Sequence, residues 1–451
     1  MSELFALGVS HKTAPLEMRE RLALTEGKAA GVLGELAGSG PITEAAAIST
    51  CNRTELYLVV SDPVAAESAA LSTLAREAGI RPTELIESLY SRRGTEAANH
   101  LFDVAAGLDS MILGEAEIQG QVKRAYELAL VEGATGPILN RLFRGALAAG
   151  KRVRSETRIG EGGISVPSAA VHLATGHLGD LSSRKVLLIG AGETAELTAR
   201  ALAARGAEAV FVANRRYDRA IGLASRFGGS AIRLDDLPAE LAKADIVVSS
   251  TNSPHHIVER EELGLVVAER EGRPLLLIDL AVPRDIDPDC REVGGVSLYD
   301  VDDVQTVADR NASGREAEAK RARTIVSSEL VRFTRWLESL EVVPTIAAMR
   351  GRATEVVERV IAENEGRWDE LSAADRERMG KMAETIATRI LHEPTLQLKR
   401  AAEREDAYLQ IAVLRQLFGL DATSEPEGAG AEVTPIRRAR GVGRRHPDGG
   451  R

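Results

Sequence analysis

A predicted strand that leads directly into a glycine-rich turn constrains this chain more than any other feature. Lys185–Ile189 is an apolar run typical of a buried strand, and a helix is predicted to follow as far as about Ala204. The turn between them offers six candidate cofactor-binding residues: Gly190, Ala191, Gly192, Glu193, Thr194 and Ala195. Glycines allow a tight bend and let a pyrophosphate approach the N–H groups of the helix N-terminus. The pattern predicts a dinucleotide site; a glycine turn without a ligand is the alternative.

The residues after this turn favour a doubly wound, Rossmann-like domain. Ala209–Ala213, Asp245–Ser249 and Leu275–Asp279 are near-continuous apolar runs, which are typical of parallel strands covered on both faces. The first of these runs is followed by Asn214 and Arg215, where an acidic residue would bind the ribose hydroxyl of NADH. A basic side chain suits a 2′-phosphate instead, so the predicted cofactor is NADPH.

One of the two cysteines lies at the end of an apolar segment. Ala45–Thr50 and Glu55–Val60 are predicted as neighbouring strands, which places Cys51 on the loop between them. A thiolate there could act as a nucleophile, and we expect the adjacent Arg53 to lower the pKa of the thiol. The alternative is a buried, inert cysteine. Cys290 lies in no recognisable motif and is predicted to be structural.

The composition excludes several classes of protein. A length of 451 residues suggests about three domains at roughly 150 residues each. Two cysteines are too few for a disulfide framework. We identify no secretory signal and no run of about 18 apolar residues, so we expect a cytosolic protein without a membrane partner. We assign no metal-binding residues.

The net charge of −10 argues against general nucleic-acid affinity. One basic run allows local contact, or alternatively forms a solvated helix face: Arg141, Arg144, Lys151, Arg152, Arg154 and Arg158.

The C-terminal part is predicted to be helical. Its first apolar residues are separated by four, three, four and three positions, which predicts a long helix with a narrow apolar seam. The helix is predicted to end before Pro344. The seam consists of Val326, Leu330, Phe333, Leu337 and Leu340. Further amphipathic patterns follow, and they need a partner for their apolar stripes. A second copy of the chain is the simplest partner.

A nucleophilic thiol combined with a hydride donor favours one chemistry. The thiolate would attack an activated acyl group, and the resulting thioester would accept hydride and leave as an aldehyde. A free carboxylate is too poor an electrophile, so the substrate is expected to be an ester, a thioester or an acyl phosphate. The local basic run fits an acyl group carried on RNA.

Several ordered motifs resemble those of the glutamyl-tRNA reductase family, from residue 4 to about residue 418. The matching segments are Gly8–Pro15, Ser49–Glu55, Gly107–Ser110, Leu113–Lys123, Gly150–Arg154, Asp279–Ile286 and His392–Thr395, together with His100. The resemblance implies NADPH-dependent reduction of glutamate esterified to its tRNA. The product would be glutamate-1-semialdehyde, in the first step of the five-carbon route to tetrapyrroles.

The resemblance also assigns roles to individual residues. Cys51 is the implied nucleophile, and Arg53 would bind the substrate's side-chain carboxylate. His100 matches a histidine important for activity, and either protonates the leaving tRNA or has a structural role. The implied substrate contacts are Thr50, Asn52, Arg53, Ser110, Glu115, Ala116, Glu117 and Gln121. Glu117 departs from the neutral residue usual in the family, and an unpaired carboxylate is unfavourable beside an anionic substrate.

The implied architecture has several parts and a homodimer. It comprises an α+β catalytic domain at 1–160, a Rossmann-like NADPH domain at 161–308, a long spinal helix at 309–343, a helical dimerisation domain at 344–420 and a disordered tail at 421–451. Hydride transfer would require the nucleotide domain to rotate about Glu161-Gly162-Gly163. The family also implies that the aldehyde passes to an aminomutase.

Two other functions stay open at this point. A reductase similar to shikimate dehydrogenase would share a small α+β domain followed by a nucleotide domain, and it would not need Cys51. A regulatory protein that binds tRNA and senses nucleotides would carry the same motifs without turnover.

Overall fold

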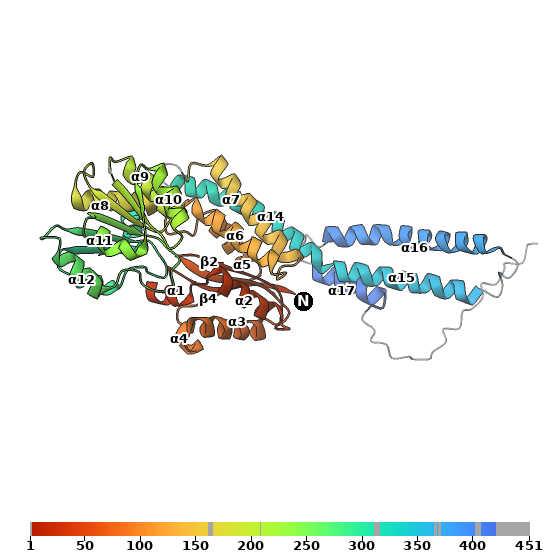
Figure 1. The fold of residues 1–451 in the computed structure, drawn as a ribbon. Helices are drawn as coiled ribbons and strands as arrows, with labels where there is room; N and C mark the ends of the chain where they lie inside the picture. Colours follow the sequence, from red (N-terminus) through yellow and green to blue (C-terminus); the bar gives the residue numbers. More distant parts are fainter. Residues whose placement is uncertain are drawn as a thin grey trace, which may run out of the picture. The chain divides into compact units, whose positions relative to one another are not determined.

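The computed structural model describes residues 2–160, 166–207, 209–310, 316–364, 368, 371–401 and 407–420 (Figure 1). The chain divides into two compact units, Met1–Leu337 and Glu338–Arg451. The predicted hinge at Glu161-Gly162-Gly163 and the predicted tail at 421–451 lie outside the described residues.

The first unit begins with an antiparallel sheet in the order β2-β3-β1-β4. Its strands are β1 (Glu3–Ser10), β2 (Ile42–Ser49), β3 (Arg53–Val60) and β4 (Tyr90–Arg93). Every residue of β3 is buried, since it lies between two other strands and both faces of the sheet are covered. In Figure 1, α3 lies on one side of this sheet and α6 and α7 lie on the other. The structure confirms the predicted strands on either side of Cys51.

Helices make up most of the remainder of this N-terminal part, which confirms the α+β class. They are α1 (Leu16–Leu22), α2 (Glu26–Ala37), α3 (Pro63–Ala78), α4 (Pro82–Ile86), α5 (Gly94–Ala105), α6 (Glu117–Val131) and α7 (Pro137–Glu156). We call residues 2–160 the catalytic domain from here on, after the role that the sequence predicts for them.

Residues 166–310 form a second sheet with helices on both sides, and we call this part the nucleotide domain. The sheet is parallel, in the order β10-β9-β8-β5-β6-β7. Its strands are β5 (Lys185–Ile189), β6 (Ala209–Ala213), β7 (Ser230–Ile232), β8 (Ile246–Ser249), β9 (Leu275–Asp279) and β10 (Val296–Tyr299). Its helices are α8 (Val166–Leu178), α9 (Glu193–Ala203), α10 (Tyr217–Arg226), α11 (Leu237–Leu241), α12 (Arg260–Ala268) and α13 (Val301–Arg310), with 3-10 turns at Leu234–Asp236 and Pro288–Glu292.

The alternation of side chains along β5 explains why this domain has two hydrophobic layers. Val186 and Leu188 face one helical layer, whereas Leu187 and Ile189 face the other. The doubly wound prediction is therefore confirmed. The sequence did not predict the edge strands β7 and β10, because they are short and only partly buried.

The helix α14 (Glu316–Glu341) carries the predicted apolar seam. Val326 and Phe333 are buried in the hydrophobic core of the catalytic domain, and the ring of Phe333 lies 6.3 Å from that of Phe102. Leu330 and Leu337 pack against the same core. This part of the seam is therefore covered by the chain's own catalytic domain.

The second unit contains α15 (Val343–Asn364), α16 (Ala373–Ala401) and α17 (Ala407–Leu417), and α15 and α16 lie side by side in Figure 1. As predicted, the long helix ends before Pro344, which is the second residue of α15. The buried core of this unit is small and consists of Val342, Ile346, Met349, Leu391 and Leu398. Large apolar side chains are exposed at Val356, Val360, Met382, Ile386 and Ile390. None of the described helices is long and apolar enough to cross a membrane.

A substitution at Gly150 of α7 tests how closely this helix packs on α5, and Gly34 of α2 provides the control. A Cβ added at Gly150 would lie 2.4 Å from the carbonyl oxygen of Ala105, whereas a Cβ at Gly34, on the exposed face of α2, would have no neighbour within 4 Å. We expect Gly150→Ala to lower the free energy of unfolding by about 1–3 kcal/mol through overpacking. Gly34→Ala should raise it by about 0.5–1 kcal/mol, because glycine is the poorer helix former. Urea unfolding measures both changes, and equal signs would contradict the close contact.

Candidate active site

The turn between β2 and β3 holds Cys51 in a fixed backbone arrangement. The N–H of Thr50 donates to the carbonyl oxygen of Arg53 at 2.8 Å, and the N–H of Asn52 donates to Oγ1 of Thr50 at 3.2 Å. Cys51 is partly exposed, whereas Cys290 is fully buried. The exposure of the two thiols thus fits a reactive Cys51 and a structural Cys290. We call residues 50–52 the nucleophile turn, after the role predicted for Cys51.

The cation beside this turn is Arg19 of α1, not the predicted Arg53. Nη1 of Arg19 donates to the carbonyl oxygen of Cys51 at 2.6 Å. Burial raises the pKa of the Cys51 thiol to about 12, the charge of Glu115 raises it further, and the charge of Arg19 opposes the rise. The expectation that Arg53 lowers this pKa is wrong, because its buried side chain pairs with Glu55 and Asp109 instead.

A fully buried carboxylate, Glu55, lies next to the nucleophile turn and accepts four hydrogen bonds. Its donors are Nη1 of Arg53 at 2.7 Å, the hydroxyl of Tyr57 at 2.7 Å, Nε2 of His100 at 3.0 Å and the hydroxyl of Tyr90. Burial opposes ionisation, yet the charge of Arg53 and the hydrogen bonds hold the pKa of Glu55 well below its ordinary value. We call these five residues the Glu55 cluster.

Both terminal nitrogens of Arg53 are occupied in this structure. Besides Glu55, Nη1 contacts Oδ2 of Asp109 at 3.0 Å, and Nη2 donates to the carbonyl oxygen of Asp109 at 2.6 Å. Lys12 also pairs with the carboxylate of Asp109. The Arg53 side chain is only 1% exposed, whereas that of Asp109 is 20% exposed. A substrate carboxylate that binds Arg53 must therefore displace Asp109, and that role stays a prediction.

His100 is a buried member of the Glu55 cluster with a defined proton position. A carboxylate can only accept a hydrogen bond, so the bond to Glu55 places a proton on Nε2. The other ring nitrogen, Nδ1, is then the one that faces away from Glu55. Glu55 and Asp109 lie within the motifs that resemble the family. Their roles were not predicted, because nothing in the sequence shows that Glu55 bonds both Arg53 and His100 or that Asp109 bonds Arg53.

The loop between α5 and α6 and the start of α6 carry five of the predicted substrate positions, of which Glu115 and Glu117 act electrostatically on the Cys51 thiol. Ser110, Glu115 and Ala116 lie on this loop, and Glu117 and Gln121 lie in the first turns of α6. Burial raises the pKa of Glu115 to about 7, the charge of Glu117 adds to the rise, and Arg53 opposes it.

The same loop also connects the catalytic domain to the nucleotide domain. Its residue Ile112 is buried within the hydrophobic core of the nucleotide domain. Gly114 has a φ of 81°, and a Cβ there would lie 2.4 Å from the carbonyl oxygen of Ile159. Burial raises the pKa of Glu117, and the charge of Glu193 at the start of α9 adds to the rise. The charge of Glu193 in the predicted nucleotide turn therefore interacts with that of Glu117, a predicted substrate position.

The nucleotide turn has the geometry that a pyrophosphate needs. Gly190 has a φ of 113°, and a Cβ there would lie 2.8 Å from the carbonyl oxygen of Ser250. Gly192 precedes the first residue of α9, and a Cβ there would meet nothing within 4 Å. Open space in front of a helix N-terminus fits a bound phosphate. Ala191, Glu193, Thr194 and Ala195 complete this turn and open α9, while Asn214 and the exposed Arg215 follow β6.

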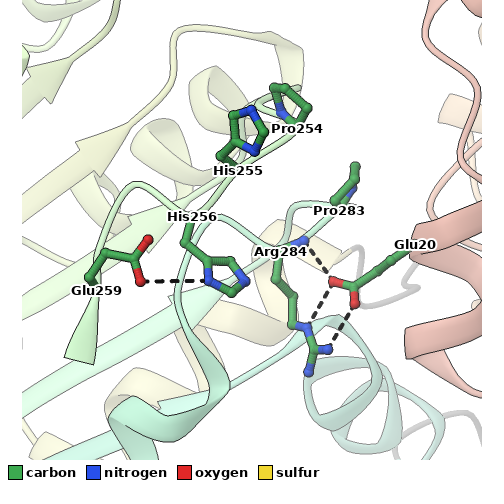
Figure 2. A pocket seen from close by; sticks show the side chains of 7 residues that line it. All are labelled: Glu20, Pro254, His255, His256, Glu259, Pro283 and Arg284. Atoms are coloured by element: carbon green, nitrogen blue, oxygen red, sulfur yellow. Dashed lines mark hydrogen bonds and ion pairs between the residues drawn. The ribbon is translucent and has the colours of Figure 1, made fainter.

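One cleft is lined by residues of α1 and the nucleotide domain, and its lining does not include Cys51. Figure 2 shows this cleft of about 300 Å³, where Glu20 of α1 faces the nucleotide domain. Nε and Nη2 of Arg284 each donate to the Glu20 carboxylate at 2.8 Å. Side-chain atoms of His256 and Glu259, which line this cleft, and of Asp287 lie within 4.8 Å of one another. We assign no catalytic step to this cleft.

Several cations of the predicted basic run contact other groups of the chain. Arg152 pairs with Glu156 at 2.8 Å and also with Glu329 of α14. Arg141 lies 5.7 Å from the ring of Trp336, and Nη1 of Arg154 donates to the carbonyl oxygen of Ala116. Several of these cations therefore stabilise the catalytic domain and α14. Arg141, Arg144, Lys151 and Arg158 are exposed, so a local contact with RNA stays a prediction.

A pair of buried carboxylates on the same sheet tests the importance of charge in the Glu55 cluster. Glu44 of β2 accepts backbone N–H groups of Ile138 and Leu139 at 3.1 and 2.7 Å. We expect Glu55→Gln to lower the free energy of unfolding by about 3–5 kcal/mol, because it leaves the Arg53 charge poorly compensated. Glu44→Gln should cost about 1–3 kcal/mol, because it loses one hydrogen bond from a backbone N–H and leaves no buried cation without its partner. Guanidinium unfolding gives both values, and an equal cost would argue against an ionised Glu55.

Three family models match the sequence. "Glutamyl-tRNAGlu reductase, N-terminal domain" matches residues 7–157, "Shikimate / quinate 5-dehydrogenase" matches 172–307, and "Glutamyl-tRNAGlu reductase, dimerisation domain" matches 321–420.

Whole-chain relatives agree with these models. The glutamyl-tRNA reductase of Rubrobacter xylanophilus is 42% identical over 430 residues, which are 95% of this chain and 98% of that protein. The glutamyl-tRNA reductase of Pelotomaculum thermopropionicum is 40% identical over 422 residues, 94% of this chain and 95% of that protein. The solved structure of the glutamyl-tRNA reductase from Methanopyrus kandleri is 32% identical and covers 93% of this chain and 99% of its own, with a TM-score of 0.53. The chain therefore belongs to the glutamyl-tRNA reductase family.

Proposed function

We propose that the protein uses NADPH to reduce glutamate esterified to its tRNA, and that it releases glutamate-1-semialdehyde and free tRNA in the first step of tetrapyrrole synthesis. Membership of the glutamyl-tRNA reductase family supports this reaction. The main structural support for the proposed reaction is the position of Cys51 on a turn that contacts the nucleotide domain. Nε2 of Gln305 in α13 donates to Oδ1 of Asn52 at 3.2 Å. Nucleophile and nucleotide turn thus belong to one compact unit.

The proposed reaction has two stages, both at Cys51. The thiolate sulfur attacks the ester carbonyl carbon, a C–S bond forms, and the C–O bond to the tRNA ribose breaks as that oxygen takes up a proton. When bound, NADPH supplies the hydride that reduces the thioester carbonyl carbon. The C–S bond then breaks, which releases the aldehyde and regenerates the thiolate.

The residues around Cys51 supply positioning and proton transfer. Because the hydrogen bond to Glu55 occupies Nε2 of His100, we assign protonation of the leaving ribose oxygen to Nδ1 of the doubly protonated ring, which afterwards keeps its Nε2 proton. Arg53 would bind the substrate's side-chain carboxylate in place of Asp109. Thr50, Asn52, Ser110, Glu115, Ala116, Glu117 and Gln121 complete the proposed substrate site. At a pKa of about 7, Glu115 can exchange a proton near neutral pH.

The proposal includes partners and a location. The match of residues 321–420 to the dimerisation domain of the family supports a homodimer, and the exposed apolar residues of α15 and α16 provide surface for it. Glutamyl-tRNA is the macromolecular substrate, and handover of the reactive aldehyde to an aminomutase would protect it from water. A free nucleophilic thiol suits the reducing cytosol.

The cofactor preference depends on Arg215 in this proposal. We expect Arg215→Ala to lower kcat/KM for NADPH about tenfold or more and to leave kcat/KM for NADH nearly unchanged, because only NADPH carries the 2′-phosphate. Arg219→Ala, which removes another exposed arginine two residues into α10, is the matched control and should change neither value. Equal use of the two cofactors by the unaltered protein would refute the assignment.

The thiol itself provides the decisive test of the reaction. With glutamyl-tRNA as substrate, we expect Cys51→Ser to reduce NADPH oxidation about 1000-fold or more, since an alcohol is a far weaker nucleophile than a thiolate. Cys290→Ala should retain activity, because Cys290 is buried in another part of the fold. Full reduction by Cys51→Ser would favour a reductase similar to shikimate dehydrogenase. Binding of both ligands without NADPH oxidation by the unaltered protein would favour a regulatory function.

A further inference from the structure

Arg19 is shared between the nucleophile turn and the nucleotide domain. Nη1 donates to the carbonyl oxygen of Cys51 at 2.6 Å, and Nη2 contacts both carboxylate oxygens of Asp302 at 2.7 Å. Arg19 is only 3% exposed, and its Nε has no partner among the described residues. The Arg19 guanidinium is therefore held in one orientation, between the backbone carbonyl of Cys51 and the carboxylate of Asp302 in the nucleotide domain.

Asp302 belongs to α13, whose opposite face is anchored in the nucleotide domain. Val304 and Ala308, one helical turn apart, are buried in the hydrophobic core of that domain. Asp302 and Gln305, also spaced for one face, both contact the catalytic domain, since Gln305 donates to Asn52 at 3.2 Å. One rigid helix thus connects the nucleotide domain to two side chains that touch the nucleophile turn.

We propose that Asp302 is a positioning residue that restrains Arg19, so that the placement of the nucleotide domain controls how reactive the Cys51 thiol is. While Asp302 pairs with Arg19, the guanidinium charge is largely compensated and the thiol stays protonated. When α13 moves away, the same charge becomes available to stabilise the thiolate. The inference rests on the proposed nucleophilic role of Cys51.

The charged groups around the thiol support this direction of the effect. The charges of Glu115, on the loop before α6, and Glu117, in α6, both raise the pKa of the thiol. Arg19 of α1 opposes them. Asp302 of α13 is the carboxylate paired with that cation. Loss of the Asp302 charge should therefore lower the pKa of the Cys51 thiol and increase the thiolate fraction at a given pH.

Alkylation with iodoacetamide tests the inference without turnover. The thiolate sulfur displaces iodide and forms a C–S bond, and mass spectrometry of the full-length protein measures the rate at each cysteine. We expect Asp302→Asn to speed Cys51 alkylation at pH 8 about three- to tenfold, because a fall of one pKa unit raises the thiolate fraction about tenfold. The rise of rate with pH should move to lower pH, which a merely looser structure would not produce.

The matched control is the neighbouring carboxylate, Asp303, which pairs with Arg291 and not with Arg19. Asp303→Asn should leave the alkylation rate of Cys51 unchanged within about twofold. In an Arg19→Gln background, Asp302→Asn should lose most of its effect, because the cation that it frees is absent.

Three results would overturn the inference. They are an unchanged rate in Asp302→Asn, an equal acceleration in the Arg19→Gln background, and a parallel rise at the buried Cys290, which would report general loosening. The proposed reductase function would survive all three results, because it is judged by NADPH oxidation with glutamyl-tRNA.

Discussion

The ionised, buried carboxylate of Glu55 is the interaction on which the candidate active site depends. A charge in the interior is tolerated only when a cation and hydrogen-bond donors surround it, and Arg53, His100 and the two tyrosines provide these. The carboxylate in turn fixes the direction of the Arg53 guanidinium and the ring proton of His100. Residues that the sequence assigned separately to substrate binding and catalysis are thereby held by one acid on the central strand β3 of the sheet.

A second constraint comes from the contacts between the catalytic and nucleotide domains. The neighbouring residues Arg19 and Glu20 of α1 pair with Asp302 and Arg284 of the nucleotide domain. Ile112, from the loop that carries the proposed substrate residues, is buried in the nucleotide domain. Rotation of the nucleotide domain toward a thioester would have to break or rebuild these contacts. They therefore provide a physical means by which nucleotide binding and thiol chemistry influence each other.

Much of the fold could be predicted from local pattern, whereas the electrostatics of the site could not. The strands next to Cys51, the glycine turn after β5 and the break before Pro344 depend on residues close in sequence, and all three are confirmed. Arg53 was expected to act on the adjacent thiol because it is two residues away. The structure turns its side chain into the interior and places Arg19, 32 residues away in sequence, beside the turn instead.

The sequence by itself determined the fold class, the family and the identity of the candidate nucleophile. Periodicity, turn residues and ordered motifs are local properties, and a reader of the chain can observe them directly. Only the tertiary structure decided which charges surround Cys51, which partner Arg53 takes and which helix of the nucleotide domain touches the nucleophile turn. These properties depend on burial and on contacts such as Arg19 with Asp302, which are 283 residues apart. Electrostatic interactions act through space, so their effect on a thiol becomes defined only when the chain has folded.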